Sequence, residues 1–383
     1  MSKVEVSAIP LAQMRTHRST KWRDFPGDVL PMAVAEMDFA IAEPIRALLL
    51  DMVSKSDLGY LGSVPEVATS FAYFAKKRWN WIVDPEQIHI VTDVGVGAVE
   101  VLRVLTTPGD KILINSPVYH NFSTWIDETH LTKVDVPFGD AQSGWAIDFA
   151  EIEKAYRSGI KVHLLCHPHN PLGRVYSREE LLKFVALAKT YGVYIVSDEI
   201  HAPLTFSESE FVPFLSLGQD AQDVGITITA ASKAWNLAGL KCAFALSQGP
   251  VMHAKLQELP EATHYRASLL GAFATATAFA EGSDWLDGAL KTLDENRRFL
   301  KKILSEKLPT VGYEIPECSY LAWLDLSSLN VGQSPAEFLL NKARVGINGG
   351  ETFGPHTGQF VRLNFATGQD VLEEAVNRIL KAL

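Results

Sequence analysis

Short apolar runs alternate with segments of helical periodicity through the middle of the chain, and this alternation constrains the fold more than any other feature. Most runs end near Gly, Pro, Asp or Ser, and residues 179–191 repeat apolar side chains at helical spacing. Strands that alternate with helices predict an α/β fold, whose mostly parallel sheet is covered on both faces. Such sheets bind ligands at the carboxyl ends of their strands, where we expect the chemistry. The expected strands cover residues 88–91, 111–114, 162–165, 194–196 and 226–229.

The pattern changes after residue 280, which indicates a second, smaller α+β domain. A chain of 383 residues is long for a single core, because single cores stop growing near ~250–300 residues. We predict a large domain over 46–282 and a small domain formed by 1–45 and 283–383. The expected elements of the tail are a helix over 284–308 capped by Ser283, a strand over 320–326, a helix opened by a capping box at 334–337, a strand over 360–365 and a last helix from about Gln369.

Composition narrows the class of partner. The net charge of -10 argues against nucleic acid and, more weakly, against anionic membranes. The longest stretch of low charge, residues 267–280, is shorter than the ~20 residues of a membrane-spanning helix. The N-terminal residues lack the apolar region of a signal peptide, and the three cysteines show no CxxC spacing. We therefore expect a soluble, cytoplasmic protein with reduced thiols.

Three successive strand ends carry reactive side chains. The strand over 162–165 runs into a turn with Asn170, the next into Asp198, and the third into Ser232 and Lys233. Pyridoxal 5'-phosphate (PLP) chemistry needs such a set: a lysine for the aldehyde, a carboxylate for the pyridinium nitrogen and a donor for the ring oxygen. Each residue alone also fits an ordinary cap, turn or surface position. Their joint occurrence on consecutive strand ends favours a PLP site.

A cluster of histidines offers an alternative interpretation as a zinc site. Zinc needs three or four converging ligands. Against this, His163 alternates within a strand and proline separates His167 from His169, so we predict no metal. The candidate ligands are His163, Cys166, His167, His169 and His201.

These motifs resemble those of the aspartate-aminotransferase-like, fold-type I PLP enzymes. Within that group the chain is most similar to the MalY/PatB-type carbon–sulfur β-lyases, which include bacterial cystathionine β-lyases. The resemblance implies a large domain with a mostly parallel seven-stranded sheet between helices, plus a smaller α+β domain. It covers nearly the whole chain from about Arg23. The motifs that carry it are residues 30–39 (LPMAVAEMDF), 116–122 (SPVYHNF), 169–174 (HNPLGR), 197–201 (SDEIH) and 232–240 (SKAWNLAGL).

The resemblance implies a role for each matched residue around the cofactor. Lys233 carries PLP as a Schiff base and moves the substrate Cα proton. Asp198 pairs with the pyridinium nitrogen, and Tyr119 stacks on the ring. Asn170 and His201 face the ring oxygen O3′. The phosphate is expected at Val96 and Gly97, at the start of a helix, and at Ser232 and Lys241.

The resemblance also implies how substrate and partner are bound. Arg362 grips the substrate α-carboxylate, with Asn170 and Ala35 as further substrate contacts. Tyr60 reaches the phosphate of the other subunit, which implies a homodimer with shared active sites. Strand alternation alone places Arg362 on a face with Phe360 and Asn364, where its partner is either a substrate carboxylate or a structural salt bridge.

The expected reaction is α,β-elimination from L-cystathionine or a related cysteine S-conjugate, which yields a thiol, pyruvate and ammonia. The first alternative is an aminotransferase, and the second is a regulatory or binding protein on the same scaffold. Two departures from the branch pattern bear on the substrate: Ala33 stands where Trp is frequent, and Leu172 where Thr is usual. A third departure is Lys241, where the aspartate aminotransferases use Arg.

Overall fold

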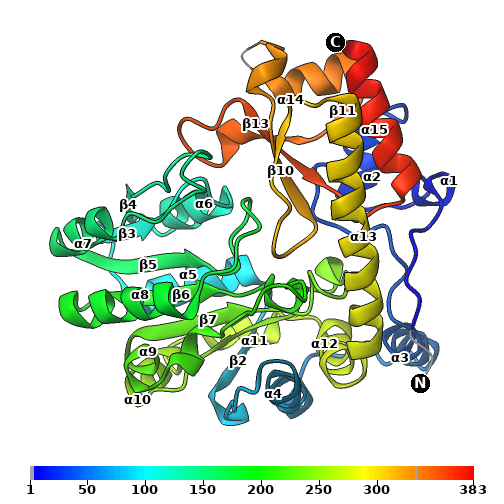
Figure 1. The fold of residues 1–383 in the computed structure, drawn as a ribbon. Helices are drawn as coiled ribbons and strands as arrows, with labels where there is room; N and C mark the ends of the chain where they lie inside the picture. Colours follow the sequence, from blue (N-terminus) through cyan, green and yellow to red (C-terminus); the bar gives the residue numbers. More distant parts are fainter. Residues whose placement is uncertain (1–3, 333) are drawn as a thin grey trace.

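The large sheet of the computed structural model organises the fold (Figure 1). The structure describes residues 4–332 and 334–383. Seven strands lie in the order β2-β8-β7-β6-β5-β3-β4, and β8 runs antiparallel to both of its neighbours while the other pairs are parallel. The expected mostly parallel seven-stranded sheet is therefore confirmed. The strands are β2 (Ile88–Val91), β3 (Lys111–Ile114), β4 (Thr132–Asp135), β5 (Ile160–Cys166), β6 (Tyr194–Asp198), β7 (Gly225–Thr229) and β8 (Ala243–Leu246).

Helices cover both faces of this sheet, as the run of buried strands requires. In β3, Ile112 and Ile114 belong to one apolar cluster and Leu113 to the other, because successive side chains point to opposite faces. The helices are α3 (Glu43–Ser54), α4 (Pro65–Trp79), α5 (Val94–Leu105), α6 (Asn121–Glu128), α7 (Phe149–Arg157), α8 (Arg178–Tyr191), α9 (Gln219–Val224), α10 (Pro250–Leu256), α11 (Glu261–Tyr265) and α12 (Leu269–Glu281).

A second, antiparallel sheet of four strands in the order β12-β13-β10-β9 lies beside the large one (Figure 1). The long helix α13 runs from α12 up to this sheet. The strands are β9 (Gly312–Tyr313), β10 (Leu321–Asp325), β12 (Asn348–Gly349) and β13 (Phe360–Asn364). The helices of this part are α13 (Ser283–Lys307), α14 (Pro335–Phe338) and α15 (Gln369–Ala382), and α1 (Leu11–Met14) and α2 (Thr20–Arg23) come from the N-terminal segment.

The N-terminal segment joins the C-terminal part through a strand pair. β1 (Leu30–Pro31) pairs in parallel with β11 (Val345–Gly346), so residues more than three hundred positions apart share one ladder. This pairing supports our proposal that 1–45 and 283–383 form a small domain and 46–282 a large one. Residues 1–3 and 333 of that division lie outside the described residues. None of the described helices has both the length and the hydropathy to span a membrane.

The expected cap of the long helix is wrong. Gly282, not Ser283, is the N-cap of α13, and the Gly282 N–H also closes α12 on the Ala278 carbonyl. One glycine thus ends one helix and begins the next. A Cβ added to Gly282 would lie 2.4 Å from Trp235 Nε1, so the position has room only for glycine. Ser334 does cap α14: its hydroxyl accepts the Glu337 N–H, one of the two bonds of a capping box.

Candidate active site

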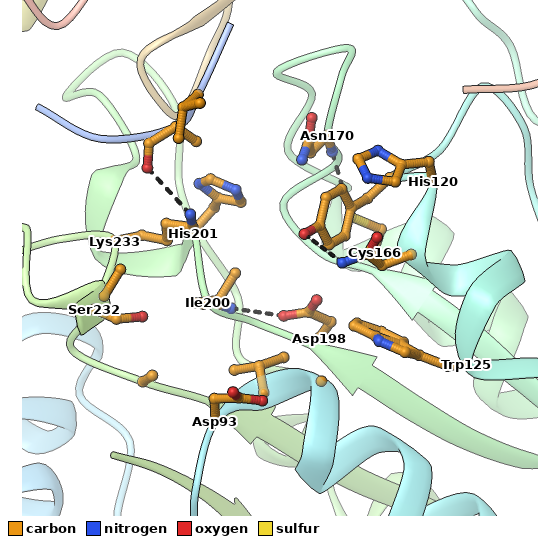
Figure 2. Close-up of a pocket in the computed structure, with 18 of the residues that line it drawn as sticks. Asp93, His120, Trp125, Cys166, Asn170, Asp198, Ile200, His201, Ser232 and Lys233 are labelled. Atoms are coloured by element: carbon orange, nitrogen blue, oxygen red, sulfur yellow. Dashed lines mark hydrogen bonds between the residues drawn. The ribbon is translucent and has the colours of Figure 1, made fainter. Parts of the chain in front are cut away.

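A cavity of about 410 Å³ lies at the carboxyl ends of β5, β6 and β7, where the sheet topology predicts a ligand site (Figure 2). Segments from both sheets and from the N-terminal part of the chain form its wall. Among the described residues, the predicted site residues that line it are Ala35, Tyr119, Asn170, Asp198, His201, Ser232, Lys233, Lys241 and Arg362.

Asp198 ends β6 as a buried carboxylate that lacks an ion-pair partner among the described residues. Its Oδ1 accepts the Ile200 N–H at 3.1 Å (Figure 2). Burial raises the pKa of Asp198 to about 7, and the charge of Lys233 lowers it only in part. A buried carboxylate of this kind is stabilised by a cation placed against it, such as a protonated ring nitrogen.

Lys233 follows β7 and points into the cavity (Figure 2). Its Nζ donates to the Ala35 carbonyl oxygen at 3.2 Å. Burial and the charge of Arg362 lower the pKa of Lys233 to about 8, against the opposing effect of Glu36 and Asp198. A fraction of this amine is therefore neutral near pH 7, as a nucleophile or base requires.

The backbone of Tyr119 is bonded to the Asn170 turn: the Tyr119 N–H donates to the Asn170 carbonyl at 3.0 Å. The Asn121 amide donates to the Tyr119 hydroxyl oxygen at 2.8 Å. Burial raises the pKa of Tyr119, so the phenol is neutral at physiological pH. Hydrogen bonds thus hold both the backbone and the hydroxyl of Tyr119 in the wall of the cavity that also contains Lys233 and Asp198.

The residues of the α5 N-terminus that line the cavity lie two positions earlier in the sequence than expected. Val94 and Gly95 line the cavity, whereas Val96 and Gly97 do not. Asp93 caps α5: its Oδ1 accepts the Val96 N–H, and its carbonyl accepts the Gly97 N–H, both at 2.8 Å. These two N–H groups are consumed by the cap and are not free for a phosphate.

A cation and a tryptophan frame the same helix end. Lys241 Nζ pairs with Asp93 Oδ2 at 2.8 Å. A Cβ added to Gly95 would lie 3.1 Å from Trp125 Nε1, so the glycine keeps the backbone open toward the cavity. Ser232 lines the wall nearby. A helix N-terminus, a hydroxyl and a lysine are the donors that a phosphate needs.

Arg362, on β13, is buried without a carboxylate partner in the described part of the chain. Its guanidinium donates to Asn170 Oδ1 at 3.1 Å and to Asn348 Oδ1 at 2.9 Å, and it lies 4.9 Å from the Phe353 ring centroid. Its Nε is buried without a partner, and burial lowers the pKa of Arg362 to about 10. Arg362 therefore forms no structural salt bridge with a carboxylate of the described residues. Its unpaired Nε–H is available to donate a hydrogen bond to an incoming carboxylate.

Two further predicted residues differ in their exposure. His201 is buried with Nδ1 unpaired, and burial with the charges of Lys233 and Arg362 lowers its pKa to about 3. It is therefore neutral at pH 7 and can donate or accept one hydrogen bond to a ligand. Tyr60 is 98% exposed on the connection between α3 and α4 and does not line the cavity of its own chain.

The candidate zinc ligands do not converge. His163 is bonded to the Tyr156 hydroxyl and to Asn115 Oδ1, and His167 to the Val212 carbonyl. Within residues 4–332 and 334–383, no group of three or more His, Cys, Asp or Glu side chains is placed to hold a metal ion.

Sequence reasoning missed several residues of the cavity wall. Asp93 could have been found, because it follows β2 as the other candidates follow their strands. Asn348 left no local signal, since it reaches the cavity through the pairing of β12 with β13. Of the two departures near the pocket, Ala33 lines the cavity and Leu172 does not. The lining residues that the sequence analysis did not assign to the site are Val34, Asp93, Val94, Gly95, His120, Asn121, Trp125, Ile200, Ala230, Ala238, Cys242 and Asn348.

The cavity fits PLP by its donors and charges. A lysine amine of lowered pKa, an unpaired carboxylate, a neutral histidine and a helix N-terminus with Ser232 and Lys241 surround one space. The fold and the site together define a PLP-dependent enzyme of fold type I.

Comparison with known proteins agrees with this class. The family model for aminotransferase class I and II matches residues 28–379, and the chain belongs to this family. A cystathionine β-lyase of Corynebacterium glutamicum is 35% identical over 373 residues, covering 97% of this chain and 99% of its own. The cystathionine β-lyase PatB of Bacillus subtilis is 33% identical over 365 residues, 93% of each chain.

A solved structure agrees at the level of the fold. Cystalysin from Treponema denticola, whose crystal structure contains PLP, superposes with a TM-score of 0.91 at 28% identity over 96% of both chains. The expected fold, the cofactor and the resemblance to the PatB-type branch are confirmed. The expected enzyme class, a PLP-dependent lyase, is confirmed by the full-length relatives.

Proposed function

We propose that this enzyme cleaves L-cystathionine or a related cysteine S-conjugate by α,β-elimination, releasing a thiol, pyruvate and ammonia. The observation that carries the proposal is one cavity holding Lys233, Asp198 and an arginine without a carboxylate partner among the described residues. The names of the two curated relatives support the substrate class.

PLP, when bound, withdraws electrons from the substrate Cα and so acidifies its proton. Asp198 favours the protonated ring nitrogen, because its carboxylate lacks a counter-ion among the described residues. Lys233 would hold PLP through its amine, and the same amine, when free, would take the substrate Cα proton. The Cβ–S bond breaks with its electron pair going to sulfur, and the released unsaturated amino acid hydrolyses to pyruvate and ammonia.

The substrate is oriented from the small-sheet side of the cavity. We propose that Arg362 binds the α-carboxylate, with Asn170 and Ala35 completing the contact. The bidentate geometry of a guanidinium sets the direction of the Cα–H bond toward Lys233. The Nε of Arg362, buried and unpaired, supports this role.

The cofactor contacts are proposals of the same kind. Tyr119 stacks on the ring, and Asn170 and His201 face its O3′ oxygen. We place the phosphate on Val94 and Gly95 rather than on Val96 and Gly97, whose N–H groups are bonded to Asp93. Ser232 and Lys241 add the hydroxyl and the charge.

We also propose a homodimer with shared active sites in the cytoplasm. Tyr60 and Leu58 are 98% and 58% exposed on one connection, which supports a covering subunit there. The Tyr60 hydroxyl would then reach the phosphate in the partner subunit. The cysteines Cys166, Cys242 and Cys318 are all free, which supports a reducing compartment.

The test is an assay of the purified holoenzyme with L-cystathionine and without a keto acid, following pyruvate and free thiol together. Continuous release of both in equal amounts is expected. Pyruvate that forms only after a keto acid is added would make the protein an aminotransferase, and the Lys233 assignment would stand. If the protein reacts with no amino acid, the remaining alternative is a regulatory or binding protein on the same scaffold.

A further inference from the structure

The Ala35 carbonyl oxygen accepts two hydrogen bonds in the cavity. Lys233 Nζ donates to it at 3.2 Å (Figure 2), and the Tyr320 hydroxyl donates to it at 3.0 Å. Tyr320 lies one residue before β10 and is 1% exposed. A lysine amine and a buried phenol from distant parts of the chain thus meet on one oxygen.

That oxygen is held in place from both sides. Asn364, on β13, donates its amide to the carbonyls of Val34 and Glu36, each at 2.7 Å. Asn236, three residues after Lys233, bonds both the N–H and the carbonyl of Met37 at 2.9 Å. The Ala35 carbonyl is therefore fixed relative to the loop of Lys233 and to the strand of Arg362.

In the proposed reaction the Lys233 amine is released when the substrate amine replaces it. It must then stay within reach of the substrate Cα and be neutral enough to accept a proton. A carbonyl oxygen holds the amine in either protonation state but favours the charged form. A second donor on the same oxygen reduces its capacity to stabilise the ammonium.

We propose that Tyr320 is a positioning residue, whose hydroxyl shares the Ala35 carbonyl with the released amine of Lys233. The carbonyl docks the amine near the substrate, and the bond from Tyr320 weakens the preference of that carbonyl for the ammonium, so that the amine stays ready to accept a proton. The proposal rests on the function proposed above, in which Lys233 is the base. Nothing in it requires Tyr320 to touch the substrate or the cofactor.

Several charged and titratable groups face Lys233. Glu36 comes from the N-terminal segment, Asp198 from β6, His201 from the turn that follows β6, and Arg362 from β13. Burial raises the pKa of Tyr320, so its hydroxyl remains a donor over the working pH range. The Tyr320 hydroxyl is thus a neutral donor that acts on the Lys233 amine only through the shared oxygen.

The test compares Tyr320→Phe with wild type as holoenzymes, using L-cystathionine with hydrogen or deuterium at Cα. Without the hydroxyl, the oxygen stabilises the ammonium more strongly, and the acidic limb of the kcat profile moves up by about half to one pH unit. We expect kcat near pH 7 to fall about three- to tenfold, with KM and cofactor absorbance unchanged. The deuterium effect on kcat grows, because proton removal becomes slower than the other steps.

Tyr313→Phe is the matched control, since Tyr313 is also buried, and its hydroxyl bonds only weakly to the Arg297 carbonyl at 3.4 Å. It should change neither the pH profile nor the deuterium effect. If Tyr320→Phe leaves both unchanged in an active enzyme, the positioning role is overturned. If wild type neither eliminates thiol nor exchanges the Cα proton with solvent deuterium, the proposed function itself fails.

Discussion

Arg362 Nη1 donates a hydrogen bond to Asn170 Oδ1 over 3.1 Å. The bond joins β13 of the small sheet to the turn after β5 of the large sheet. The residue proposed to hold the substrate is thereby tied to one proposed to face the cofactor. A change in the position of either side chain is transmitted to the other.

Because of this bond, Arg362→Lys tests the proposed role of Arg362 in substrate binding. A lysine ammonium cannot reach Asn170, Asn348 and a carboxylate together, because it lacks the planar fork of the guanidinium. We expect KM for L-cystathionine to rise about 100-fold with a smaller fall in kcat. Arg344→Lys, at an exposed pair with Asp28, is the control and should leave steady-state kinetics unchanged. An unchanged KM in Arg362→Lys would remove the arginine from substrate binding.

Replacement of Lys233 tests the cofactor attachment. Lys233→Ala removes both the amine that binds the PLP aldehyde and the proposed base, so turnover should fall by about 10³-fold or more. The visible absorbance of the protein-linked cofactor should disappear as well. Lys154→Ala, on the surface of α7, should retain both. A Lys233→Ala protein that stays yellow and active would refute the assignment.

Replacement of Asp198 should raise the stability of the cofactor-free protein and lower the activity of the enzyme. Its folded pKa of about 7 lies above its ordinary value of 3.8, so the folded, cofactor-free protein binds the proton more tightly than the unfolded chain. The resulting penalty vanishes only well below pH 3.8, is small at pH 4, grows as pH rises and is complete above pH 7. Asn keeps the acceptor for the Ile200 N–H without the charge.

Asp198→Asn should therefore raise the Tm of the cofactor-free protein by about 2 °C or more at pH 8, and by much less at pH 4. The same change should lower kcat by about 10²-fold or more, because the ring nitrogen loses its counter-ion. Thermal denaturation at both pH values, paired with the assay, checks the two effects. Equal Tm values of wild type and Asp198→Asn at pH 8 would mean that Asp198 does not destabilise the cofactor-free protein.

Ala33 should govern the size of the accepted substrate. Ala33→Trp fills part of the cavity and should lower kcat/KM for L-cystathionine about tenfold, while a substrate with a small Cβ leaving group is less affected. Leu172→Thr is the control, since Leu172 does not line the cavity. Equal losses with large and small substrates would show general damage rather than selection by size.

A shared site, as proposed above, predicts complementation between two inactive variants. Tyr60→Ala and Lys233→Ala, unfolded and refolded together, should form hybrid dimers with one complete site. Random pairing gives about a quarter of wild-type activity. Activity no higher than the average of the two separate variants would place Tyr60 outside the partner's site. Each variant refolded alone is the control.

The periodic parts of the fold were predictable because their signal is local. The five expected strands and the helix at 179–191 correspond to β2, β3, β5, β6, β7 and α8 within two residues. Asp198 and Lys233 reached the cavity for the same reason, since strand ends meet at one edge of a parallel sheet. The gathering of the polar candidates followed from topology alone.

The rest depended on contacts without a local signal. The hydrogen bonds of Ala35 to Lys233 and Tyr320 cross 198 and 285 residues of sequence. The cap of α13 fell on Gly282 rather than Ser283, and the packing of Trp235 against Gly282, which leaves no room for a side chain there, has no local sequence signal. The bonds from the Val96 and Gly97 N–H groups to Asp93, which led us to propose Val94 and Gly95 for the phosphate instead, likewise appear only in the folded structure.

The pairing of β1 with β11 has a consequence for biosynthesis. Leu30 has no strand partner until Val345 has been translated, so this ladder cannot form while the intervening residues are being made. Lys233, the proposed PLP lysine, is synthesised well before Arg362. During synthesis, the part of the site assigned to the cofactor can thus assemble before the part assigned to the substrate, and a ribosome-bound chain that has acquired PLP is not yet able to recognise an amino acid.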